Sequence, residues 1–344
     1  MSNATIRDVA REAGVSVASV SRVMNGRDNV SAALRLKVGQ VAKALGYAPH
    51  IGARNLSMAR THAIGILLPD IHGEFFSELV RGMDREASEL GFQLLLSNIH
   101  EEPASAVKSL STMRGRVDGL VLMAPHVSTD LLFEHLPAGL PVMLVNCAQH
   151  DRTHARICID NRSAASMMVD HLADSGHREI VFICGPHDNQ EAAARLDGYR
   201  AAMEDRRLTP CMVDGNFFED SGAAAAERLI AQGRLPDALF AANDMMAIGA
   251  MTALRQAGLS VPGDIAVAGF DDIPLARLIT PALTTVSVDI AALGARALTR
   301  LSALIDGADD RQLESVAAHL VIRETSGGAA LHALSSRSDL PTTG

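Results

Sequence analysis

Tryptophan is absent from the 344 residues, and aromatic residues make up only 3% of them. The hydrophobic core must therefore be built from Leu, Val, Ile, Met and Ala. No apolar run is long enough to span a bilayer, and the residues after Met1 do not resemble a secretory signal. We therefore expect a cytoplasmic protein with no membrane partner. The cysteines are scattered outside any CxxC pattern, so we expect reduced core residues rather than disulfides or zinc ligands; they are Cys147, Cys158, Cys184 and Cys211.

The motifs of common enzymes are also missing. The sequence has no GxSxG elbow, no Walker loop, no HExxH pattern and no GxGxxG after the first predicted strand. The 13 histidines share no metal-ligand spacing with the cysteines, so we interpret them as incidental. An oxidoreductase or a hydrolase would depend on fold analogy alone, which is weak support. We predict that the protein is not an enzyme and uses no metal or cofactor.

The net charge of −9 is unevenly distributed along the chain. Residues 1–60 contain nine Arg and Lys and three acidic residues, which gives this segment a net charge of +6. The remaining residues carry a net charge of −15. A basic N-terminal segment is suited to a polyanion such as DNA, whereas the acidic remainder is not.

The basic segment begins with the pattern of two short helices. Thr5 is a suitable N-cap for a helix that ends at residue 13, and Asp8 completes a capping box with it. Gly14 can adopt the positive φ of a turn, and the serine before residues 17–25 can cap a second helix. This pattern predicts a helix-turn-helix, whose second helix enters the major groove of DNA.

The polar residues of the second helix suit the recognition of DNA. Ser16, Ser21 and Arg22 can reach base edges, and Asn25 can reach a phosphate. Arg22 is the first candidate for base recognition, because an arginine can donate to both acceptors of a guanine. The alternative is an ordinary surface helical hairpin, since small-residue turns between short helices are common.

A third helix is predicted from residue 31 to residue 45, where apolar residues recur at helical spacing. Gly46 ends this helix and completes an all-α helix-turn-helix domain at 1–46. Residues 47–61 have little apolar surface to bury, so they predict a hinge or linker that is helical only when supported.

From His62 onwards, apolar runs alternate with amphipathic stretches. Strand-helix alternation predicts an α/β fold of parallel sheets with helices on both faces, and the length favours two lobes. The tail is rich in Gly, Ser and Thr and is expected to be flexible. The predicted boundaries are an effector-binding and dimerisation core at 62–325, with lobe 1 at about 62–160 and 290–320 and lobe 2 at about 161–289, and a tail at 326–344.

Motifs along most of the chain resemble those of the LacI/GalR family of transcriptional regulators. They run from about Ala4 to Thr325 and include ATIRDVAREAGVSVASVSRVMNG at 4–26, YAP…L at 47–56, PDI…FFSELVRGM at 69–83, RLDGYRAAM at 195–203, AANDMMAIGAM at 241–251 and VPGDIAVAGFDD at 261–272. The resemblance implies a two-lobed core of the type I periplasmic-binding-protein-like fold behind the helix-turn-helix head. It also implies a homodimer that binds double-stranded operator DNA and a small-molecule effector.

The resemblance assigns DNA contacts to single residues. Positions of the recognition helix are matched by residues 16–18, Ser21 and Arg22, and Leu56 matches the leucine that the family inserts into the minor groove. The predicted DNA-binding residues are Thr5, Ser16, Val17, Ala18, Ser21, Arg22, Asn25 and Leu56. Gly52 departs from the family pattern, which usually has a better helix former at this position. A glycine there destabilises the hinge helix by roughly 1 kcal/mol.

The resemblance also assigns an effector site. Arg195, Asn243 and Asp271 match effector-contacting positions, and Asn146 matches a frequent polar contact. Phe76 and Phe217 match residues that often pack on the effector, although Gly73-Glu74 replaces the Asn-Pro that commonly precedes the first of them. An arginine, an amide and a carboxylate can together bind several hydroxyls, while a phenylalanine covers the C–H face of a sugar. The alternative is that Arg195 and Asp271 form a structural ion pair and that Asn243 caps a helix.

These observations predict an effector-responsive, sequence-specific transcriptional regulator, namely a repressor released from a pseudo-palindromic operator by a small sugar-like ligand. One alternative is a corepressor-dependent regulator that senses a purine or another small metabolite. The other is a solute-binding protein, which would explain two lobes but not the basic head.

Overall fold

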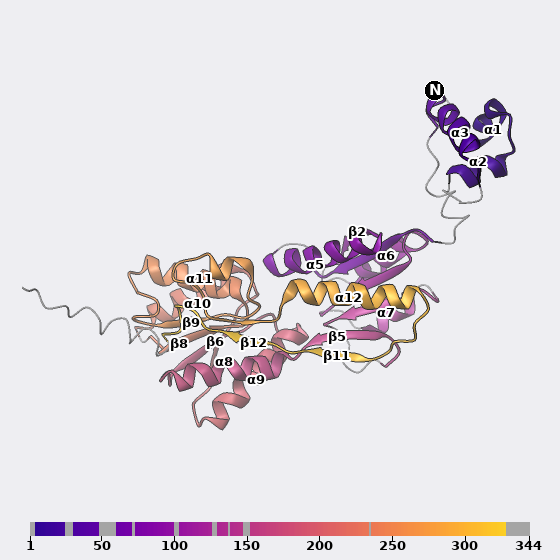
Figure 1. Ribbon diagram of the computed structural model, residues 1–344. Helices are drawn as coiled ribbons and strands as arrows, with labels where there is room; N and C mark the ends of the chain where they lie inside the picture. The colour runs from indigo at the N-terminus through magenta and orange to yellow at the C-terminus, as the bar shows by residue number, and fades with distance from the viewer. Residues whose placement is uncertain are drawn as a thin grey trace, which may run out of the picture. The chain divides into compact units, whose positions relative to one another are not determined.

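The computed structural model describes residues 4–24, 30–47, 60–70, 73–99, 103–125, 129–136, 138–146, 152–233 and 235–327. The chain forms two compact units, Met1–Thr61, which we call the head, and His62–Gly344, which we call the core domain (Figure 1). The predicted fold class, an all-α head and an α/β core with parallel sheets, is confirmed.

The head consists of helices α1 (Ile6–Ala13), α2 (Val17–Met24) and α3 (Ala32–Ala44). The predicted capping box is present, because the Thr5 backbone N–H donates to Asp8 Oδ2 over 3.0 Å and the Asp8 N–H donates to Thr5 Oγ1 over 3.4 Å. Gly14 ends α1 with a φ of 63°, as a glycine can. The three helices enclose a small core of Val9, Ala10, Ala13, Val20, Val23, Val38 and Ala42.

The predicted hinge helix, with Gly52 and Leu56, lies outside the described residues. Tyr47, the first residue of the predicted linker, donates its backbone N–H to the Ala42 carbonyl over 2.9 Å and packs on the core of the head.

Lobe 1 of the core domain is built on a six-stranded parallel sheet in the order β11-β5-β4-β3-β1-β2. Its strands are β1 (Ala63–Leu68), β2 (Gln93–Asn98), β3 (Gly119–Leu122), β4 (Val142–Val145), β5 (Ala155–Ile159) and β11 (Leu313–Val316). Side chains of β1 alternate between the two faces of the sheet, so that Ile64 and Ile66 belong to one hydrophobic cluster and Ala63 and Leu67 to another. The first cluster includes residues of α5 (Glu74–Leu90) and α12 (Ile290–Ile305), and the second those of α6 (Pro103–Met113) and α7 (Thr129–His135).

Lobe 2 is built on a four-stranded parallel sheet in the order β7-β6-β8-β9. Its strands are β6 (Ile180–Ile183), β7 (Cys211–Val213), β8 (Ala238–Ala241) and β9 (Ala266–Ala268). Helices α8 (Asn161–Asp174) and α9 (Gln190–Asp205) cover one face, and α10 (Glu219–Ala231) and α11 (Asp244–Gln256) cover the other (Figure 1). A short 3₁₀ helix, η1 (Pro274–Arg277), precedes an antiparallel pair of strands, β10 (Thr285–Ser287) and β12 (His319–Val321).

Within the described residues the chain crosses between the lobes three times, from β5 to α8, from β10 to α12 and from β11 to β12. The last crossing corrects the predicted end of lobe 1 at residue 320, since β12 pairs with β10 of lobe 2. The β10–β12 pair is antiparallel, whereas the main sheets of both lobes are parallel as predicted.

Two further expectations from the sequence are wrong. Ser326, placed in the flexible tail, is fully buried, and its hydroxyl lies 2.9 Å from Thr284 Oγ1 and 3.0 Å from His171 Nε2. Cys211, expected in the core, is exposed, because β7 is an edge strand, whereas Cys158 and Cys184 are buried as predicted. In the part of the chain that the structure describes, no helix is long and apolar enough to cross a membrane.

Helices α5 and α12 lie side by side across lobe 1 at a contact made by glycine (Figure 1). A Cβ atom added at Gly82 would lie 1.9 Å from the Ala291 carbonyl oxygen, and one at Gly294 would lie 2.3 Å from the Leu79 carbonyl oxygen. These approaches are far shorter than van der Waals contact, so a side chain at either position would push the helices apart.

We expect Gly82→Ala to lower the free energy of unfolding of the core domain by at least about 1–3 kcal/mol, because the added methyl overpacks the α5–α12 contact. Gly39→Ala is the matched control, since a Cβ atom there meets nothing within 4 Å in α3. The control should instead stabilise the head by about 1 kcal/mol. Urea unfolding of both variants checks the prediction, and equal effects of the two substitutions would contradict it.

Candidate DNA-binding surface and effector site

The outer face of α2 carries the predicted base-contacting residues. Ser16, Val17, Ala18 and Arg22 are exposed, and Ser21 is half-buried. The buried side of the helix, with Val20 and Val23, holds it against the rest of the head. Small side chains around one long cation allow close approach of the helix backbone to a DNA groove.

The other predicted DNA contacts have different positions. Thr5 is exposed at the start of α1, and its hydroxyl donates to Asp8 Oδ2 over 2.7 Å as part of the capping box. Ser16 Oγ accepts the Ser19 backbone N–H over 3.1 Å and so caps α2. Asn25 and Leu56 lie outside the described residues.

Four of the predicted effector residues follow carboxyl ends of strands. Asn146 follows β4, Phe217 lies in the segment after β7, Asn243 follows β8, and Asp271 lies after β9. In open α/β sheets, ligands bind beyond these ends. Three of the four also have positive φ angles, 49° at Asn146, 74° at Phe217 and 113° at Asp271. Such conformations cost about 1–3 kcal/mol each and cluster at functional sites.

Arg195 is the centre of this group. Its Nη2 lies 3.2 Å from Asp271 Oδ1, its Nε donates to Asn161 Oδ1 over 2.8 Å, and its Nη1 donates to the Ala242 carbonyl over 2.6 Å. The guanidinium carbon lies 3.8 Å from the centre of the Phe270 ring and 5.8 Å from that of Phe217. These contacts fix the guanidinium plane.

The sequence left open a structural alternative, in which Arg195 and Asp271 form an ion pair and Asn243 caps a helix. Both contacts are present in the structure. The Arg195 and Asp271 side chains are only 4% and 6% exposed, so their ion pair is buried. Asn243 caps α11, since its Oδ1 accepts the Met246 N–H, and its Nδ2 donates to the Phe217 carbonyl over 2.8 Å. A buried ion pair is weak support for stability as such, because desolvation opposes the attraction.

Two residues that sequence reasoning missed complete the site. Glu191 on α9 is buried, and its Oε1 accepts from Asn146 Nδ2 over 2.7 Å, which joins lobe 2 to lobe 1. Asn161 at the start of α8 accepts from Arg195. Glu191 lies four residues before Arg195 on one helix, and this i, i+4 spacing could have identified it from the sequence.

The site is closed in this structure. A cavity of about 20 Å³ lies between the lobes and is lined by Asn146, Cys158, Ile159, Asn161, Gln190, Glu191 and Ala194. That volume holds about one water molecule. A ligand of the size of a sugar therefore requires the lobes to move apart or the lining side chains to rearrange.

Burial shifts the pKa values of three carboxyl groups around Arg195. It raises the pKa of Glu191 to about 7 and that of Asp271 to about 6, while the charge of Arg195 opposes both shifts. Burial and the charge of Asp271 also raise the pKa of Asp244 well above its usual range. The Asp244 carboxylate accepts from the Thr285 hydroxyl over 2.6 Å and from the Ile273 N–H over 2.9 Å. Glu191 and Asp271 thus share the positive charge of Arg195, whereas Asp244 interacts with Asp271.

Phe76 lies on α5 of lobe 1 and packs against the first hydrophobic cluster of the core domain. It is half-buried on α5 and packs edge-on against Phe75, with ring centres 5.5 Å apart. Gly73 before it has a φ of 93°, which the Asn-Pro of the family pattern would not supply.

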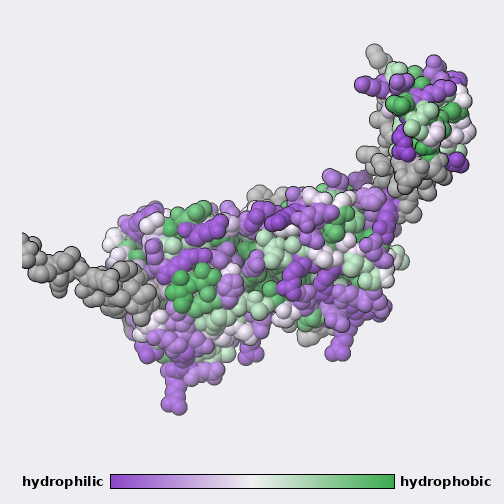
Figure 2. Space-filling view, in the orientation of Figure 1, coloured by the Kyte–Doolittle hydropathy of each residue, from purple (hydrophilic) through white to green (hydrophobic). Residues whose placement is uncertain are grey.

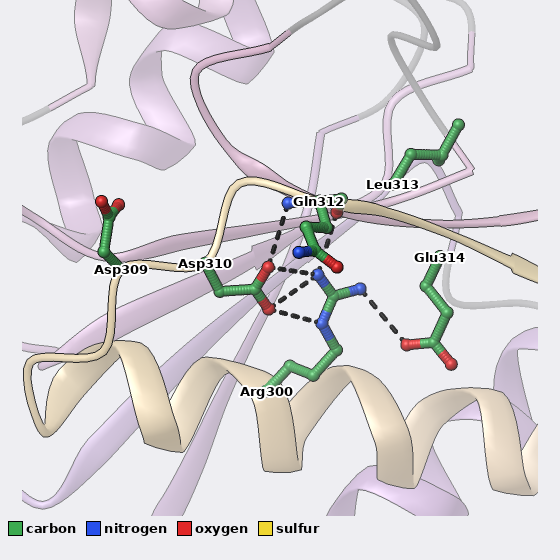
Figure 3. A pocket seen from close by; sticks show the side chains of 6 residues that line it. All are labelled: Arg300, Asp309, Asp310, Gln312, Leu313 and Glu314. Carbon is green, nitrogen blue, oxygen red and sulfur yellow. Dashed lines mark hydrogen bonds and ion pairs between the residues drawn. The ribbon is translucent and has the colours of Figure 1, made fainter.

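A larger, open hollow of about 420 Å³ lies at the outer edge of lobe 1, beside β11. Figure 3 shows that Arg300, from α12, points toward Asp310 and Glu314. Arg300 Nε donates to Asp310 Oδ2 over 2.8 Å, and its Nη1 donates to the Arg156 carbonyl over 2.7 Å. The arginine ties α12 to the edge of the sheet, and no predicted site residue lines this hollow.

Comparison with known proteins places these features in a family. Residues 5–50 match the bacterial regulatory proteins of the lacI family, and residues 169–326 match a periplasmic binding protein-like domain. Catabolite control protein A of Priestia megaterium is 35% identical over 306 residues, which cover 87% of this chain and 92% of that protein. The chain belongs to the LacI family.

Further LacI-family proteins align over most of their length. The ribose operon repressor of Escherichia coli strain K12 is 40% identical over 289 residues, which cover 82% of this chain and 87% of that protein. The structure of the lac repressor dimer bound to operator and the anti-inducer ONPF superposes with a TM-score of 0.86 at 28% identity, and covers 94% of this chain and 99% of that one. The family resemblance and the periplasmic-binding-protein-like core predicted from the motifs are thereby confirmed.

We expect Arg22→Ala to weaken specific operator binding by about 1–3 kcal/mol and to relax the preference at one G·C pair, because Arg22 is the one long cation of α2. Arg11→Ala removes the same charge from α1, where the Arg11 side chain is 77% exposed and paired with Asp8. That control should change affinity without changing sequence preference. Binding-site selection with both variants checks this, and an unchanged preference in the Arg22 variant would show that another residue contacts the base.

The raised pKa of Glu191 predicts a pH dependence of stability. Because its pKa is about 7 in the folded protein against an ordinary value of 4.5, the contribution of Glu191 is full below about pH 4.5 and is lost as the pH rises through 7. Glu191→Gln cannot ionise, so it should raise the free energy of unfolding above pH 8 by up to about 3 kcal/mol. Urea unfolding between pH 5 and pH 9 measures this effect. Glu227→Gln, at an exposed position of α10, is the control, and parallel curves for all three proteins would refute the assignment.

Proposed function

We propose that this LacI-family chain represses transcription and that a small ligand with several hydroxyl groups, bound between the lobes, controls its affinity for operator DNA. The observation that carries the proposal is that Arg195 pairs with Asp271 while Glu191, on the same helix, bonds to Asn146 of the other lobe, in a chain whose head exposes the outer face of α2. A structural core alone gives no reason to place these polar groups at the junction of the lobes.

The chemistry of the site supports a neutral, hydroxylated ligand. Arg195 and the amides supply donors, Glu191 and Asp271 supply acceptors, and Phe217 supplies an aromatic face. Glu191 and Asp271 already face the one guanidinium of Arg195, so an anionic ligand would gain little from that charge and would lose its hydration in a buried site. The ribose operon repressor among the relatives supports a sugar.

The coupling to DNA would run through the lobes. Because three segments connect the lobes, a ligand that changes their separation also shifts lobe 1, from which the chain continues to the hinge and the head. We propose that two heads of a homodimer occupy two half-sites and that Leu56 inserts into the minor groove between them. Such coupling is reciprocal, so operator DNA should weaken ligand binding by the same factor.

Exposed hydrophobic residues support a homodimer. Figure 2 shows hydrophobic patches between hydrophilic side chains on the visible face of the core domain. Leu95 and Leu96 are exposed on β2, an edge strand, and Phe218 and Leu278 are exposed on lobe 2. We also propose that the protein acts in the cytoplasm and catalyses no reaction, as fits relatives that are named as repressors.

The sign of the ligand effect separates two candidates. A sugar that lowers operator affinity is an inducer, whereas a purine that raises it is a corepressor. A thermal-shift screen of sugars and purines with the full chain, followed by operator binding with each compound that stabilises it, distinguishes them.

We expect Asp271→Ala to abolish the response to the compound found in that screen. Loss of a charge-assisted hydrogen bond costs roughly 1.5–3 kcal/mol, which is about 10- to 150-fold in ligand affinity. Operator affinity without ligand should stay within twofold, because Asp271 belongs to the core domain and not to the head. Asp170→Ala, which removes a half-exposed carboxylate from α8, is the control and should respond normally.

If Asp271 serves only the ion pair, its loss lowers the melting temperature and the operator affinity together. A well-folded Asp271→Ala protein that binds and responds normally would refute the proposed site. Calorimetry with the ligand and an operator-binding assay on the same preparation separate these results.

A further inference from the structure

The turn that carries Asp271 is strained over two residues. Asp271 has a φ of 113° and Asp272 a φ of 60°, and neither is a glycine. A residue with a Cβ atom disfavours this region, because the Cβ approaches the following carbonyl oxygen. Two such residues in succession persist only where their surroundings hold them.

Three consecutive residues of this turn are each anchored by a different part of the chain. The Asp271 N–H donates to the carbonyl of Val286, in β10, over 2.8 Å. The Ile273 N–H donates to Asp244 Oδ2 over 2.9 Å, at the start of α11. Between them, Asp272 Oδ1 accepts from Arg323 Nη2 over 2.6 Å, and this is the anchor that holds the second strained residue by its side chain.

Arg323 is itself held in place for this contact. Its Nη1 donates to the Leu283 carbonyl over 2.8 Å, and its backbone N–H donates to Thr284 Oγ1 over 2.9 Å. The side chains of Arg323 and Asp272 are 17% and 21% exposed, so solvent screens their attraction only in part. A planar guanidinium that donates to a carboxylate and a carbonyl at once fixes their relative positions, which a lysine cannot do.

We propose that Arg323 is a positioning residue of the effector site, which holds Asp272 in its left-handed conformation and thereby directs the Asp271 carboxylate toward Arg195. The inference depends on the proposed function for its biological meaning, because it concerns a residue assigned there to ligand binding. Arg323 lies two residues after the end of β12, so the anchor comes from the segment that has just crossed from lobe 1. The turn that presents Asp271 is therefore tied to the last of the three connections between the lobes.

The alternative is that the Arg323–Asp272 pair merely stabilises lobe 2. Arg206 provides a comparison for that role, since it pairs with Asp170 over 2.8 Å and with Asp174 on the outer side of α8 and α9. Its side chain is 30% exposed, and its partners are not effector-site residues.

The test uses the full chain without a ligand, so its result does not depend on whether the proposed function is correct. The variants are Arg323→Met, Asp272→Asn, both together, Arg323→Lys, and Arg206→Met as the control. Two local readouts follow the turn, the hydrogen exchange rate of the Asp271 amide and the titration of the Asp271 carboxyl, observed with ¹³C-labelled aspartate and assigned with Asp271→Asn. Melting temperatures report any general loss of stability.

We expect Arg323→Met and Asp272→Asn each to raise the exchange rate of the Asp271 amide at least tenfold, and the double variant to raise it no further. The pKa of the Asp271 carboxyl should fall toward the ordinary value of about 4, because a released turn exposes it to water. Arg323→Lys should restore only part of both readouts, and Arg206→Met should change neither. Unchanged exchange and titration in the Asp272→Asn variant, or equal changes in the Arg206→Met variant, would overturn the proposal.

Discussion

The buried guanidinium of Arg195 is the group on which the interior of lobe 2 depends. It contacts α8 through Asn161, the end of β8 through the Ala242 carbonyl, and the turn after β9 through Asp271. A single cation thus joins three elements that face the junction of the lobes. Without it, the buried carboxyl group of Asp271 would have to be neutral or leave its position, since an uncompensated buried charge is strongly destabilising.

The composition of the chain explains how these elements come so close together. With few aromatic residues to fill space, the helices approach each other at glycines, as Gly82 and Gly294 do between α5 and α12. In lobe 2, Gly249 of α11 faces the Glu219 carbonyl so closely that an added Cβ would lie 1.9 Å from it. Such contacts are rigid, because neither helix can rotate or slide without a collision.

Local signals predicted the local structure well. The Thr5–Asp8 capping box and the left-handed turn at Gly14 depend on neighbours in sequence, and both are present. The candidate site residues were predicted from motif resemblance, but the contact between Asn146 and Glu191 was not. These two residues are 45 positions apart in the sequence and meet only in the folded chain. The short strands β7, β11 and β12 and the burial of Ser326 depend in the same way on long-range contacts, which no local pattern indicates.

The closed site has a consequence for how a ligand must act. The bond from Asn146 to Glu191 spans the lobes, and Glu191 lines a cavity with room for about one water molecule. The hydroxylated ligand that we propose for this site would have to replace such contacts with its own, which would couple its binding energy to the separation of the lobes. Because the pKa of Glu191 is about 7, the same bond changes character near neutral pH: the ionised carboxylate accepts more strongly but suffers more from burial. A neutral hydroxylated ligand that donates to the carboxylate relieves part of that penalty. Its affinity and the opening of the lobes should therefore both depend on the protonation of this one side chain.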